Sequence, residues 1–104
     1  MREVTVMQSA ASVLREHIEN IEKVIIEYSV NEKEARATLE RVLEELKKTH
    51  PFSETENELY KPAVYNAIAT INTVYIKEKK SRQLMEALLE AKDELAAIEG
   101  ILTE

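Results

Sequence analysis

The amino-acid sequence predicts an all-α fold, an antiparallel up-down bundle of four helices that forms one domain over residues 1–104. The chain has only one glycine and two prolines, so few positions interrupt a helix. It has one Phe and no Trp, and its apolar residues recur at alternating spacings of three and four, which is typical of helices that bury one face. A chain of this length can hold a hydrophobic core without a metal or a disulfide.

The first helix is expected over about residues 4–28. Its apolar positions follow one seam for more than three heptads, with charged residues on either flank. The seam consists of Val4, Met7, Ala11, Leu14, Ile18, Ile21, Ile25 and Tyr28. We therefore expect one face of this helix to be buried and the other to face solvent.

The second helix is expected over residues 32–49. Asn31 and Glu34 have the spacing of a capping box, which marks a helix start. Acidic residues in the first turn and basic residues in the last turn suit the helix macrodipole. Pro51 ends the helix, because a residue before proline is disfavoured in the helical region. The buried seam consists of Ala35, Leu39, Val42, Leu43 and Leu46.

The third helix contains fifteen uncharged residues in a row, from Pro62 to Ile76. Ser53 or Thr55 could cap an earlier start, but Pro62 would then lie inside the helix and cost about 3 kcal/mol. We therefore expect a helix that restarts or kinks near Lys61 and covers about residues 62–78. Its apolar arc spans roughly 240°, which is more than one neighbouring helix can bury.

The fourth helix is expected over residues 82–101. No Gly or Pro separates it from the third helix, so a single fused helix over residues 62–102, pairing in a dimer, is the alternative. A turn is favoured because it gives four segments of similar length, each about 30 Å long. The residues expected to be buried in the bundle are Leu14, Ile18, Ile21, Leu39, Leu46, Ile71, Leu88 and Leu95.

The charge and composition exclude several classes of function. A net charge of -6 argues against nucleic acid as the main partner, because phosphate binding needs a positive face. The basic cluster of Lys77, Lys79, Lys80 and Arg82 is interpreted as a solvated turn between helices. The absence of cysteine favours a cytoplasmic protein. No stretch approaches the roughly 20 apolar residues of a membrane span, and no signal-peptide pattern is present, so membrane insertion and export are not expected.

Neither histidine has the sequence surroundings of a catalytic or metal-binding residue. Glu19 and Asn20 follow His17 where a histidine-phosphotransfer bundle would carry a lysine and a glycine. We therefore interpret His17 as an exposed or half-buried structural residue. His50 is interpreted as a partner of the C-terminal dipole of the second helix. Neither histidine is preceded by a glutamate three residues earlier, as a di-iron bundle requires.

Glu16, Glu19 and Glu22 form the one pattern that suggests an enzyme. Their spacing matches one half of the magnesium site of all-α nucleoside triphosphate pyrophosphatases, which also need Glu-x-x-Asp on the next helix. The only such pair here is Glu90 with Asp93, far down the chain. A solvated acidic face is the favoured interpretation. The sequence therefore assigns no catalytic residue, no metal ligand and no cofactor, and a role as an enzyme is the less favoured prediction.

The predicted function is protein–protein binding through the third helix. After one face has packed inward, a second apolar stripe remains, and monomers rarely leave such a patch bare. The stripe consists of Tyr65, Ile68, Asn72, Tyr75 and Ile76. A two-fold axis near Asn72 would pair its amide with its own copy. The expected partner is a second copy or another helical protein, in a homodimer or as a small adaptor subunit.

Two alternatives remain open at this point. The stripe can instead be the second wall of the chain's own core. The protein can also be a metal-dependent helical enzyme that acts on a nucleotide or another phosphorylated metabolite through Glu16, Glu19 and Glu22.

Overall fold

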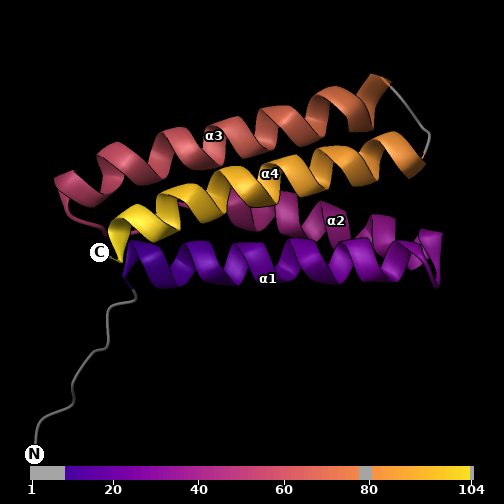
Figure 1. The fold of residues 1–104 in the computed structure, drawn as a ribbon, viewed down its shortest axis with the longest axis horizontal. Coiled ribbons are helices and arrows are strands. Elements are labelled where there is room, and N and C mark those ends of the chain that lie inside the picture. Colours follow the sequence, from indigo (N-terminus) through magenta and orange to yellow (C-terminus); the bar gives the residue numbers. More distant parts are fainter. Residues whose placement is uncertain (1–8, 78–80, 104) are drawn as a thin grey trace, which may run out of the picture.

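The structure, a computed structural model, describes residues 9–77 and 81–103 (Figure 1), with the side chains of residues 74–77 and Ser81 outside that description. Within these residues, all of the regular secondary structure is α-helical. The four helices are α1 (Ala10–Tyr28), α2 (Glu32–Lys47), α3 (Glu54–Lys77) and α4 (Ser81–Leu102). The predicted all-α four-helix bundle is confirmed.

The helices pack as antiparallel neighbours, with α4 between α1 and α3 and with α2 behind them in the view of Figure 1. Arg15 on α1 forms an ion pair with Glu99 on α4. Glu22, seven residues later on α1, pairs with Lys92, seven residues earlier on α4, so the two helices run in opposite directions. Packing is extensive between α1 and α2, α1 and α4, and α3 and α4, whereas α2 and α3 approach each other at few points. The α2–α3 seam is therefore the most open side of the bundle.

The fused-helix alternative is wrong, because α3 and α4 lie side by side. The Thr70 hydroxyl on α3 donates a hydrogen bond of 3.2 Å to a carboxylate oxygen of Glu94 on α4. In one straight helix these residues, 24 positions apart, would be separated by about 36 Å. The predicted basic cluster lies outside the described side chains except for Arg82, which is exposed.

The core is aliphatic and draws on all four helices. Of the residues expected to be buried, only Ile18 is not, since it is half-buried and packs against the edge of the core. At about 100° per residue Ile18 points roughly 60° away from Ile21, which is fully buried. The buried residues from the prediction are Leu14, Ile21, Leu39, Leu46, Ile71, Leu88 and Leu95.

The N-terminal ends of α1 and α2 are both defined by capping side chains. Asn31 has an extended backbone and its side-chain oxygen accepts from the Glu34 N–H at 3.2 Å, which confirms the predicted cap. The predicted continuous helix over residues 4–28 is wrong at Ser9, whose backbone is extended and whose hydroxyl accepts from the Ser12 N–H at 3.1 Å. Residues 4–8 of that prediction lie outside the described residues.

The predicted end of α2 and the predicted start of α3 are both wrong. The backbone of Lys48 is extended, so α2 ends at Lys47 and not at residue 49. Helix α3 starts at Glu54 and keeps Pro62 in its interior, instead of restarting near Lys61. A capping box explains the early start: the Ser53 hydroxyl accepts from the Glu56 N–H at 3.2 Å, and the Glu56 carboxylate accepts from the Ser53 N–H at 3.4 Å.

Pro62 is tolerated inside α3 because its position is exposed. Proline has no N–H to donate to the carbonyl four residues earlier, that of Glu58, which is also exposed. Water can replace the missing donor there. No helix within the described residues is long and apolar enough to cross a membrane.

Candidate functional site

The predicted binding stripe on α3 is partly exposed and partly packed. Tyr65 is 65% exposed, whereas Ile68 is half-buried and contacts the core. Asn72 is also half-buried. The side chains of Tyr75 and Ile76 lie outside the described part of the structure. The stripe was interpreted either as a binding surface or as a second wall of the chain's own core. Ile68 belongs in part to the core, whereas Tyr65 does not.

The stripe borders the open α2–α3 seam. Tyr65, Ile68 and Asn72 share one side of α3, because they follow one another at spacings of three and four. Tyr65 lines a small cavity together with residues from the end of α2, which places this side of α3 toward α2. The seam thus combines sparse contact between two helices with a large exposed ring at its edge.

A buried pair of polar side chains lies next to the seam. The His17 Nε2 atom and the Tyr60 hydroxyl are 3.1 Å apart, and each residue is only 3% exposed. The prediction of an exposed or half-buried His17 is wrong. At about 100° per residue His17 points only roughly 40° away from Ile21, the centre of the buried face, and Tyr60 supplies the polar partner that burial requires.

Two further aromatic rings complete this cluster. The rings of His50 and Phe52 stack with centroids 5.1 Å apart, and the Tyr60 ring meets Phe52 edge-on at 4.8 Å. The predicted role of His50 at the C-terminus of α2 is not observed, because α2 ends at Lys47 and the His50 ring packs against Phe52. We call His17, His50, Phe52 and Tyr60 the aromatic cluster.

Burial fixes the protonation of the buried pair at neutral pH. Loss of solvation, followed by the nearby charge of His50, lowers the pKa of His17 to about 4. Burial, followed by the negative charge of Glu45, raises the pKa of Tyr60 to about 12. His17 is therefore neutral and Tyr60 keeps its proton. A general acid or base works best with a pKa near the operating pH, so this pair is arranged for structure and not for proton transfer.

A cavity of about 40 Å³ lies between the end of α2, the segment after it and the first half of α3. Two members of the aromatic cluster line it, together with Tyr65 from the predicted binding stripe. The full lining consists of Leu46, Lys47, Lys48, Thr49, His50, Asn57, Tyr60, Lys61, Val64 and Tyr65. The volume exceeds the roughly 10–15 Å³ that one water needs and falls far short of the roughly 300 Å³ of a metabolite pocket.

The three glutamates of the alternative prediction do not form a metal site in the structure. Glu16, Glu19 and Glu22 are exposed on α1, and Glu22 is within 3.4 Å of the Lys92 ammonium group. Within the described residues, no group of three or more His, Asp or Glu side chains could hold a metal ion.

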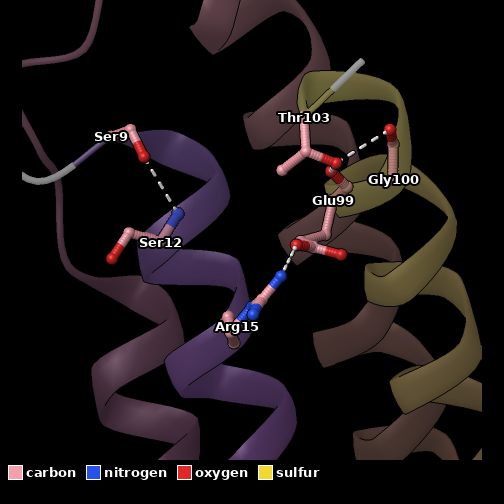
Figure 2. A network of polar contacts seen from close by, with 6 residues as sticks. All are labelled: Ser9, Ser12, Arg15, Glu99, Gly100 and Thr103. Atoms are coloured by element: carbon pink, nitrogen blue, oxygen red, sulfur yellow. Dashed lines mark hydrogen bonds and ion pairs between the residues drawn. The ribbon is translucent and has the colours of Figure 1, made fainter.

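A polar network joins the start of α1 to the end of α4 (Figure 2). The Arg15 guanidinium donates to the Glu99 carboxylate at 2.7 Å, and the Thr103 hydroxyl donates to the Glu99 and Gly100 carbonyls at 3.1 Å. The side-chain carboxylate and the backbone carbonyl of Glu99 thus both accept hydrogen bonds within the chain. This network connects α1 to α4 at one end of the bundle, where Arg15, Glu99 and Thr103 border an open hollow of about 280 Å³.

No protein-family model, no curated protein and no solved structure matches this chain significantly.

Proposed function

We propose that this protein acts without catalysis, by binding a second copy of itself through the outer face of α3 around Tyr65, Ile68 and Asn72. The observation that carries this proposal is that Tyr65 is 65% exposed beside the open α2–α3 seam. A tyrosine offers a large contact area at low cost in conformational entropy, and its hydroxyl can still find a polar partner. A helix laid along this seam would cover both Tyr65 and the exposed edge of Ile68.

Several features support protein over other partners. The net charge of -6 disfavours nucleic acid. The half-buried Asn72 gives the face one polar group that can fix the register of a symmetric helix pair. A cysteine-free chain suits the cytoplasm, which is the compartment we propose.

Sedimentation velocity over a range of concentrations tests the proposal, with Tyr65→Glu as the disruptive variant. Ile26→Glu on α1 is the matched control, because Ile26 is 66% exposed and the substitution adds the same charge. We expect the wild-type chain and Ile26→Glu to dimerise, and Tyr65→Glu to remain a folded monomer by circular dichroism. A wild-type monomer at high micromolar concentration would refute the proposal, as would equal effects of both substitutions.

The metal-dependent enzyme acting through Glu16, Glu19 and Glu22 remains the alternative, and no feature of the described structure favours it. Thermal stabilisation by magnesium at modest concentration, lost in Glu19→Gln, is the result that would reverse this preference.

A further inference from the structure

The lining of the small cavity beside Tyr65 differs in charge from the chain as a whole. The chain carries 20 acidic and 14 basic residues, yet the lining includes Lys47, Lys48 and Lys61 and no Asp or Glu. Lys48 is paired with Glu45 at 2.7 Å, but Lys47 and Lys61 form no ion pair with any described residue. Two ammonium groups without an ion pair to a described residue thus border one small hollow, and Lys61 also lines a second hollow with Glu54 and Glu58.

The cavity also carries hydrogen-bond donors whose capacity the described residues do not use. His50 contributes to the lining, and its buried Nε2 atom has no partner there. The Asn57 side-chain amide donates one hydrogen to the Phe52 carbonyl at 3.4 Å, and its second hydrogen is available to another acceptor. The Asn57 amide can donate to an acceptor held in the cavity, and the His50 Nε2 atom is a second donor beside it when it carries the ring proton.

The Tyr60 hydroxyl is a further donor in one of the two tautomers of His17. With the proton on Nε2, His17 donates to the Tyr60 oxygen and the phenolic hydrogen is free for another acceptor. With the proton on Nδ1, a buried N–H is left without an acceptor among the described residues. Either tautomer leaves Nδ1 unpaired among the described residues, so an acceptor in the cavity, to which the phenolic hydrogen donates, is what would favour the first arrangement.

We propose that this cavity binds a carboxylate group, which is either a small free carboxylate or an Asp or Glu side chain of a bound protein. A carboxylate only accepts hydrogen bonds when ionised, so it matches a site made of donors and ammonium groups. The volume of about 40 Å³ admits a group of a few heavy atoms. Tyr65 places the cavity at the edge of the α3 face, where the acidic side chain of a partner can enter. The carboxylate site stands independently of self-association.

Acetate is the probe, and NMR signals of the histidine rings are the readout. We expect acetate to shift the His50 ring signals in a saturable way, while acetamide, its neutral analogue of the same shape, does not. His17 does not line the cavity but contacts the Tyr60 hydroxyl, so its ring signals should shift less than those of His50. Lys61→Gln should weaken acetate binding by roughly two- to fivefold, the size expected for one solvent-exposed charge contact. Lys33→Gln, at an exposed position in the first turn of α2, is the matched control.

Three results would overturn the carboxylate site: a His50 shift that does not saturate, an equal shift with acetamide, or an equal loss of binding in Lys33→Gln. Sedimentation velocity then identifies the source of the carboxylate. If a second copy supplies it, acetate and Lys61→Gln will both weaken the dimer. If acetate binds and association is absent or unchanged, the ligand is a free carboxylate or another protein's side chain. Failure of self-association alone therefore leaves the carboxylate site supported by the NMR result.

Discussion

Acidification should destabilise the fold through His17, and the size of the effect follows from its burial. The folded protein holds the imidazole neutral with a pKa of about 4, whereas the unfolded chain has the ordinary value of 6.5. The unfolded state therefore binds a proton first as the pH falls, so stability is lost between pH 6.5 and pH 4 and is fully present above this window. The loss relative to pH 7 amounts to about 2 kcal/mol at pH 5 and about 3 kcal/mol at pH 4.

Urea unfolding at a series of pH values measures this loss, with His17→Leu as the comparison. The variant lacks the titrating group, and its other costs, such as the unpartnered Tyr60 hydroxyl, are the same at every pH in this range. The hydrogen bond to Lys48 is the main cause that lowers the pKa of Glu45 and is kept in both proteins, whereas the smaller contribution of His17 is lost in the variant. The unfolding free energy of the wild-type protein minus that of the variant should therefore fall by about 3 kcal/mol from pH 7 to pH 4.

A difference that stays constant over this range would refute the reasoning. It would mean that His17 titrates with its ordinary pKa in the folded state, and hence that its side chain reaches water. The His17 imidazole would then not be shielded from water in the folded protein.

Denaturant unfolding also tests three further features of the fold. Leu88→Ala should cost about 2–5 kcal/mol, because Leu88 is fully buried, whereas the exposed neighbour Leu89→Ala should cost far less, and equal costs would contradict the packing of α4. Ser53→Ala should cost about 1 kcal/mol by removing the cap of α3, while Thr55→Ala, the rival cap, should be nearly neutral; the reverse order would place the helix start elsewhere. Gly100→Ala should stabilise the chain by about 0.5–1 kcal/mol, because Gly100 lies in a helix and a Cβ there would meet nothing within 4 Å. A loss of stability would contradict the open space around this position.

Local patterns predicted most of the helical architecture. Asn31 was identifiable because its cap depends only on residues three positions apart. The buried seams were identifiable because burial follows the helical period, as the fully buried Leu39 and Leu95 show. The turn between α3 and α4 rested on a weaker argument, the balance of helix lengths, and the Thr70–Glu94 contact now supports it.

The errors arose where a competing interaction decided the structure. Pro62 was expected to make α3 restart or kink near Lys61, but the capping box at Ser53 and the burial of Tyr60 hold the preceding turns in the same helix. Ser9 was placed inside the first helix because its apolar neighbours keep the period, although serine is a frequent N-cap.

Sequence reasoning missed the aromatic cluster as a unit. His17 and Tyr60 both lie near the centre of a buried helical face, and this common placement was the available signal for a pair. Their contact joins residues 43 positions apart, so no local pattern could show it. The charge of the cavity was hidden for the same reason, since Lys47 and Lys61 belong to different helices.

Isotope-filtered NOE spectroscopy on a mixture of labelled and unlabelled chains tests association through α3 most directly. Because Tyr65 and Ile68 would lie near the centre of a symmetric interface, we predict intermolecular NOEs from the Tyr65 ring to Ile68 methyl groups of the other copy. Intermolecular NOEs that involve only other faces, such as the one around Ile26, would contradict binding through α3. A sample without any intermolecular NOE at high micromolar concentration would contradict self-association altogether.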